Sequence, residues 1–229
     1  MEIIDATSLA ATLDRLNEAF FHGTPLSGSQ REQAAKWLAG RQGLPGSYAG
    51  MFAPTEKDIR RGIQVFTGEK VRSRAATCHI LGEEACRALI LLGVRLAGVQ
   101  EALRRATAGM ATRLEQARQR PSGIPGTYCC GTCTCSLWRH LAAGGLAGHE
   151  GWLAAGMKAL KAHRLGNGRW RRFPFFYTLL ALQEIDLPSA VDELRYAAPV
   201  CERLVKRSRK SGKHIQRRRL LAERALAKC

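Results

Sequence analysis

Four of the eight cysteines lie within seven residues, at Cys129, Cys130, Cys133 and Cys135. A thiol at the start of a helix has its thiolate stabilised by free backbone N–H groups and by the helix dipole, which lowers its pKa. A helix is predicted to begin near Cys133, so Cys133 and Cys135 are the candidate nucleophiles or metal ligands. Small buried thiols that only pack at a helix end are the alternative explanation.

The spacing Cys130-x-x-Cys133 is typical of metal ligands and of redox pairs. A structural zinc site normally has a second Cys/His pair at similar spacing, which the sequence lacks, and the nearest imidazole, His140, lies seven residues after Cys133. We therefore predict no metal site, with metal binding and a redox pair left as alternatives. Reduced thiols are expected, because a chain of 229 residues with 45% hydrophobic residues does not need disulfides to fold.

His79 and Glu83 lie four residues apart in the most apolar helical segment of the chain. A buried carboxylate needs partners, so the two residues mark an internal polar site. The alternative is a structural ion pair between Glu83 and Arg87, which have the same spacing, and we favour that pair.

The elements that position these residues are all predicted to be helices. Apolar residues recur at helical spacing along the chain, and no segment alternates apolar and polar residues, so the fold class is all-α. One domain is expected over residues 1–200, followed by a basic helical segment over 201–229. The predicted helices cover residues 5–21, 27–40, 55–66, 70–97, 99–119, 133–143, 149–163, a segment that opens at 174, 189–209 and 214–228.

A glycine-containing turn followed by an aromatic residue occurs three times, at Tyr48, Tyr128 and Trp170. The aromatic residues are 80 and 42 residues apart, which fits a period of about 40 residues with one unit lacking the turn. Such periods in helical chains are typical of stacked α-hairpins. If the helices that follow the three turns converge at their starts, they bring together Glu56, Cys133, Cys135, Tyr177 and Thr178.

Two of these turns, WLAGRQGLPGSY and LKAHRLGNGRW, resemble the repeats of the terpene cyclase and protein prenyltransferase β-subunit superfamily. The resemblance covers roughly residues 28–185. It implies a partial or complete α/α toroid whose inner helices line a cavity near their N-termini. The aspartate-rich motif of the squalene cyclases is missing, and no Asp, Cys and His match the prenyltransferase zinc positions, so the chemistry of the family is not carried over.

The net charge is +17, and the last 29 residues hold eleven Lys and Arg against two acidic residues. A basic block of this kind predicts attraction to polyanions such as nucleic acid, although a solvated basic helix is an equal alternative. The candidate anion-binding residues are Arg171, Arg172, Lys206, Arg207, Arg209, Lys210, Lys213, Arg217, Arg218 and Arg219.

Two functions follow from these observations. The first is an enzyme or small-ligand-binding protein for an anionic or apolar molecule, with Cys133, Cys135, His79, Glu83 and Tyr177 as candidate catalytic residues. The second is a helical scaffold that binds nucleic acid through its basic C-terminal segment. No P-loop or dinucleotide-binding motif points to a cofactor. The chain has no apolar run of roughly 18 residues and no secretory signal, so a cytoplasmic location is expected.

Overall fold

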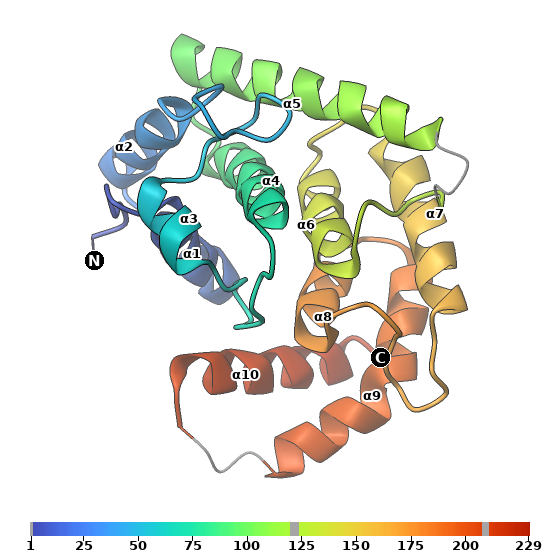
Figure 1. Cartoon of the computed structure of the whole chain (residues 1–229). Coiled ribbons are helices and arrows are strands. Elements are labelled where there is room, and N and C mark those ends of the chain that lie inside the picture. The colour runs from blue at the N-terminus through green and yellow to red at the C-terminus, as the bar shows by residue number, and fades with distance from the viewer. Residues whose placement is uncertain (1, 120–123, 208–210) are drawn as a thin grey trace.

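The computed structural model describes residues 2–119, 124–207 and 211–229. These ranges contain ten α-helices and no β-strand, which confirms the all-α prediction (Figure 1). None of the helices in the described ranges is both long and apolar enough to cross a membrane. The helices are α1 (Leu9–His22), α2 (Gly28–Ala39), α3 (Glu56–Arg61), α4 (Arg74–Leu92), α5 (Ala97–Arg118), α6 (Gly131–Ala142), α7 (His149–Ala162), α8 (Phe175–Glu184), α9 (Pro188–Arg207) and α10 (Lys213–Ala227).

The core of the protein surrounds α4 and α6. Fourteen of the 19 residues of α4 and ten of the 12 residues of α6 are buried, against five of 22 in α5. A helix that is apolar on most of its faces is stable only when other elements cover it on all sides. α4 is covered in this way by α1, α2, α5 and α6.

Five of the helices contact one another in series. α4 packs against α1 and α6, α6 packs against α8, and α8 packs against α10. The remaining long helices lie outside this series, with α2 and α5 against α4, α7 against α6, and α9 against α8. Figure 1 shows α4, α6 and α8 in the middle of the molecule and α2, α5, α7 and α9 toward its edges.

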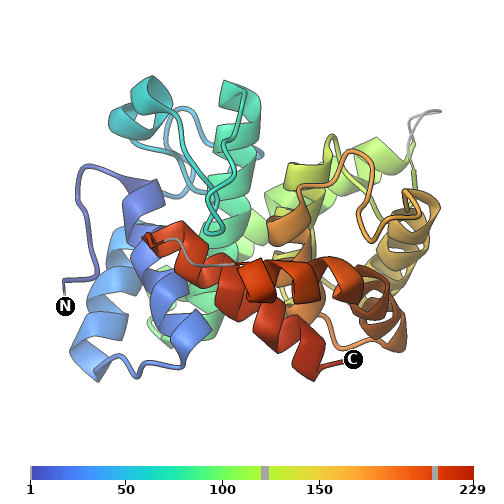
Figure 2. The same cartoon turned by 90° about the horizontal axis from the view of Figure 1, so that it is seen from below.

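Ion pairs between α1 and α10 join the two ends of the chain. Arg217 of α10 is 4% exposed, and its guanidinium binds Asp14 at 2.7 Å and Glu18 at 2.6 Å. The same guanidinium lies 3.8 Å from the centre of the Phe66 ring. Viewed from below, α10 lies beside α1 (Figure 2). A residue near the C-terminus therefore completes the packing of the N-terminal helix.

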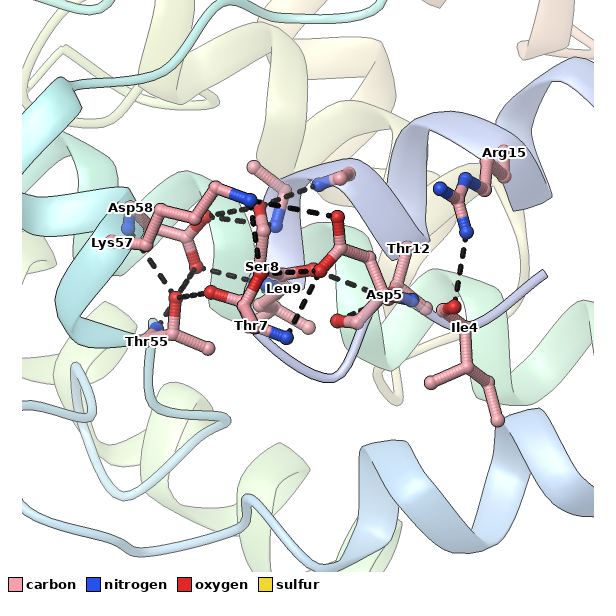
Figure 3. Close-up of polar contacts among 12 residues, drawn as sticks. Ile4, Asp5, Thr7, Ser8, Leu9, Thr12, Arg15, Thr55, Lys57 and Asp58 are labelled. Atoms are coloured by element: carbon pink, nitrogen blue, oxygen red, sulfur yellow. Dashed lines mark hydrogen bonds and ion pairs between the residues drawn. The ribbon is translucent and has the colours of Figure 1, made fainter. Parts of the chain in front are cut away.

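Asp58 fixes the start of α1 against α3 (Figure 3). Its buried carboxylate accepts hydrogen bonds from the Ser8 hydroxyl at 2.6 Å and from the backbone N–H of Leu9 at 2.9 Å. It also accepts the backbone N–H of Thr55, as the predicted capping box requires. One carboxylate thus accepts the first N–H group of α1 and the N–H group of the residue that caps α3.

Several predicted boundaries differ from the structure, and two helices end five residues earlier than predicted. The helix predicted for residues 55–66 ends at Arg61, because Gly62 has a φ of 68° and turns the chain. The helix predicted for 70–97 ends at Leu92, with Gly93 as a left-handed C-cap, rather than at Gly98. The boundary predicted after residue 200 falls inside α9, and α10 packs directly against α8 and α9.

Candidate functional site

Glu83 lies between two buried imidazoles. One carboxylate oxygen is 3.0 Å from Nε2 of His79, and the other is 2.5 Å from Nδ1 of His140. Burial opposes ionisation, but the charge of His140 and the hydrogen bonds from both imidazoles outweigh it and lower the pKa of Glu83 to about 2. The predicted contact of His79 with Glu83 is present. The predicted pair of Glu83 with Arg87 is wrong, because that guanidinium binds other residues.

The helix that holds the cysteine cluster begins two residues earlier than predicted. α6 starts at Gly131 with Cys130 as its N-cap, whose Sγ accepts the backbone N–H of Cys133 at 3.4 Å. Cys133 and Cys135 are fully buried inside the helix. The thiols of Cys129 and Cys130 raise the pKa of Cys133, and burial raises the pKa of Cys135 to about 12. The expected lowering of these two pKa values is therefore wrong.

The thiol with the lowered pKa is that of Cys130. Hydrogen bonds from the Cys129 and Cys133 thiols lower the pKa of Cys130 below its usual value. Backbone N–H groups in the first turn of α6 act in the same direction. A helix start therefore lowers the pKa of a thiol here, but the thiol is that of the N-cap residue Cys130. The sequence prediction had placed Cys130 in the turn before the helix.

His79 lies next to the thiols and under two tyrosines. One of its ring nitrogens and the Sγ atoms of Cys129 and Cys133 all lie within 4.8 Å of one another. The His79 ring centre lies 4.8 Å from the Tyr48 ring and 4.6 Å from the Tyr128 ring, and the two tyrosine hydroxyls are hydrogen-bonded to each other. The aromatic residues of the first two turns therefore meet over one imidazole. We call His79, Cys129, Cys130 and Cys133 the thiol–imidazole cluster.

Two nitrogen atoms around Glu83 have no hydrogen-bond partner. They are Nδ1 of His79 and Nε2 of His140. Every other buried side-chain nitrogen or oxygen in the described part of the chain has a hydrogen-bond partner. His79 is 1% exposed and His140 is fully buried. An unpaired buried polar atom is costly and needs an explanation, such as an ion or another ligand.

The other residues predicted to converge lie in three different places. Cys135 Sγ is 3.4 Å from the Thr178 hydroxyl, so these two helix starts do meet. Tyr177 turns away and donates its hydroxyl to Glu84 at 2.5 Å. Glu56 is exposed and lies 3.7 Å from Arg60. The structure brings together Cys133, His79 and Glu83, but not Glu56.

A second buried polar group lies further along α4. Arg87 and Arg139 both bind the carboxylate of Glu184, at 2.6 and 2.8 Å. Asn17 accepts from both guanidinium groups, and Glu84 accepts from Arg139 and Tyr177. Burial opposes ionisation of Glu184, but the charges of Arg139 and Arg87 lower its pKa. We call this group the ionic network: Asn17, Glu84, Arg87, Arg139, Tyr177 and Glu184.

The ionic network borders a cavity of about 860 Å³ at the C-terminal ends of α1, α4, α8 and α10. A cavity was predicted at the helix N-termini instead. At that end, the rings of His79, Tyr48 and Tyr128 occupy the space, and the Glu69 carboxylate caps the first N–H groups of α8. We call the observed space the basic cavity, because its charged lining residues are Arg31, Arg87, Arg139, Arg224 and Lys228 against the single acidic residue Glu184.

Much of the predicted anion-binding set has partners within the protein. Lys213 and Arg217 bind Asp14, Arg218 donates to the backbone oxygen of Thr67, and Arg219 pairs with Glu223. Arg171, Arg172 and Lys206 are exposed, and Arg207 is the last residue of α9. Arg209 and Lys210 lie outside the described residues.

Sequence reasoning missed the residues that α6 contributes to both polar groups. Arg139 and His140 are adjacent in α6, and they face the adjacent carboxylates Glu84 and Glu83 of α4. The available signal was the presence of two consecutive ionisable residues in each of two strongly apolar helices. Buried charges in such helices must find partners on a neighbouring helix.

No protein-family model, curated protein or solved structure matches this chain. The thiol–imidazole cluster and the basic cavity are therefore the features from which a function can be inferred.

Proposed function

We propose that the chain binds an anionic small molecule with an apolar portion, and that the basic cavity is its binding site. The observation that carries this proposal is the composition of the cavity lining, in which five basic residues face one acidic residue. A volume of about 860 Å³ lies within the range of roughly 300–1,000 Å³ that is typical of small-molecule sites.

The walls of the cavity support a ligand with an apolar portion. Phe20, Phe21, Leu91 and Leu180 contribute apolar surface, and Leu91 is 42% exposed. An exposed leucine on a cavity wall loses water contact when a ligand covers it, which favours binding by about 25 cal/mol per Å² of buried apolar surface.

The basic residues at the rim support an anionic group. Arg224 donates to the backbone oxygen of Phe21 at 2.6 Å, and Lys228 donates to that of Gln183 at 2.6 Å. Each bond uses one N–H group, and a guanidinium has five donors and an ammonium three. The remaining donors of both side chains are available to a phosphate or carboxylate.

The order of the helices supports the α/α toroid expected from the sequence resemblance. In this proposal α1, α4, α6, α8 and α10 form the inner ring, and α2, α5, α7 and α9 form the outer layer. Its support is the series of contacts among the inner helices and the ion pairs of Arg217 that link α10 to α1. A molecule such as a prenyl diphosphate has the size and the two-part chemistry that the basic cavity requires.

Calorimetric titration with farnesyl diphosphate and with farnesol tests the proposal, because the two probes differ in the anionic group. We expect the diphosphate to bind more tightly than the alcohol. Leu91→Trp, which fills the cavity from an exposed position, should weaken diphosphate binding by about tenfold or more, equivalent to roughly 1.4 kcal/mol. Arg224→Gln should weaken diphosphate binding while leaving farnesol binding nearly unchanged.

Arg104→Gln is the matched control, since Arg104 is exposed on α5 and pairs with Glu101 of the same helix. It removes one positive charge without touching the cavity and should bind as the wild type does. Diphosphate binding that Leu91→Trp does not affect, and that disappears as salt is added, would contradict the proposal and favour polyanion binding at the surface.

A further inference from the structure

The thiol–imidazole cluster has three metal-ligating atoms from two distant segments of the chain. Cys129 and Cys133 come from the start of α6, and His79 comes from α4, fifty residues earlier. All eight cysteines are free thiols. The buried His79 nitrogen without a hydrogen-bond partner, Nδ1, is an independent sign that the cluster lacks one component.

We propose that Cys129, Cys133 and His79 form a binding site for Zn²⁺. Zinc is bound by cysteine sulfur at about 2.3 Å and histidine nitrogen at about 2.0 Å, in tetrahedral geometry. These bond lengths place neighbouring ligand atoms roughly 3.5–3.8 Å apart. The three atoms already lie within 4.8 Å of one another, so small side-chain rotations complete the site.

Glu83 and His140 complete the surroundings that a zinc-bound histidine requires. Nε2 of His79 is held by Glu83, which leaves Nδ1 as the nitrogen that binds the metal. The second oxygen of Glu83 is held by His140, so the carboxylate cannot rotate away. A carboxylate behind a ligating imidazole fixes the orientation of the ring and increases its basicity. This explains why a carboxylate and two imidazoles are buried together in an apolar helix pair.

The structure assigns three protein ligands rather than four. Cys130 is close to the other thiols, but its Sγ caps α6 by accepting the N–H of Cys133, and it lies outside the group of three atoms. Cys129 is exposed, so the fourth position of the ion faces solvent. A site with two cysteines, one histidine and an open position is typical of catalytic zinc, which activates a water molecule or a carbonyl group.

At Cys133, burial favours a metal ligand over a nucleophile. Cys133 is fully buried, so it cannot attack an external substrate, whereas a metal ligand needs no solvent access. The half-buried rings of Tyr48 and Tyr128 pack against His79 and limit solvent access to its imidazole. The zinc proposal does not depend on ligand binding in the basic cavity, which lies at the opposite end of α4.

Metal analysis of the full chain, purified with a phosphine reductant and without chelators, tests the proposal. We expect about one zinc ion per chain by mass spectrometry. After removal of zinc, Co²⁺ should give the thiolate-to-cobalt absorption band in the near ultraviolet. Cys129→Ser, Cys133→Ser and His79→Gln should weaken metal binding by on the order of 100-fold or more, and Glu83→Gln by about 10- to 100-fold.

Two matched controls keep the test specific. Cys130→Ser retains an efficient N-cap and should still bind one metal ion, and Cys201→Ala removes a buried thiol on α9, away from the cluster. Circular dichroism of each variant separates loss of metal from loss of helix. A well-folded wild-type chain that holds neither zinc nor cobalt would overturn the proposal, as would a disulfide among the three clustered cysteines. Loss of metal in Cys130→Ser equal to that in Cys133→Ser would overturn the three-ligand assignment.

Discussion

Adjacent carboxylates on α4 face adjacent residues on α6, yet the two pairs have different surroundings. Glu83 faces His140 beside the thiol–imidazole cluster, where two ring nitrogens lack partners. Glu84 faces Arg139 in the ionic network, where each charged group has an oppositely charged or hydrogen-bonding partner. Buried polar groups that are fully satisfied hold a fold together, whereas unsatisfied ones indicate a missing ligand. The ionic network therefore stabilises this helix pair, whereas the groups around Glu83 belong to the proposed metal site.

We expect the largest loss of stability when the ionic network is broken. Arg139→Met leaves Glu84 and Glu184 without their shared partner, and an unpaired buried charge costs about 3–5 kcal/mol. We expect the midpoint of thermal unfolding to fall by about 10 °C. Arg104→Met makes the same change at an exposed position and should alter the free energy of unfolding by less than about 0.5 kcal/mol. Equal stability of the two variants would contradict a stabilising role of the ionic network.

A smaller loss is expected from disturbing His140 on the other side. A Cβ atom at Gly145 would lie 2.1 Å from Nε2 of the fully buried His140 and 2.8 Å from the backbone oxygen of the same residue. Gly145→Ala should therefore lower the free energy of unfolding by about 1–3 kcal/mol and weaken zinc binding. Gly151→Ala, on α7 with nothing within 4 Å of the added Cβ, is the control and should be neutral or stabilising. Urea unfolding and cobalt titration of both variants measure the two effects.

The smallest effect is the acid sensitivity of the ionic network. The charges of Arg139 and Arg87 lower the pKa of Glu184 below its usual value of 4.5 in the folded protein. Its contribution to stability is therefore complete above that pH and is lost as the pH falls below it. The free energy of unfolding should decline less steeply below pH 4.5 in Glu184→Gln than in the wild type. Glu150→Gln, at an exposed position on α7, should leave the slope unchanged, and an unchanged slope in Glu184→Gln would contradict the pairing.

Local signals in the sequence are enough to predict the helices. Apolar spacing, capping residues such as Ser27 and Thr55, and terminating glycines such as Gly23 act within a few residues of one another, so they can be read locally. The same local reasoning placed His79 next to Glu83, because residues four apart share a helix face. Local reasoning was wrong about the end of α3, where the chain turns at Gly62.

Which helix faces which is set by tertiary packing, and so are the partners of the buried polar residues. Glu83 could have paired with Arg87 within its own helix, but the packing of α4 against α6 brings His140 closer and draws Arg87 to Glu184. His79 and Cys129 are fifty positions apart in the sequence, and no local pattern links them. The location of the cavity likewise depends on tertiary packing, because large side chains fill the space at one end of the helices and leave it open at the other. Pairing between helices depends on their rotation and offset, and these are fixed only when the whole core packs.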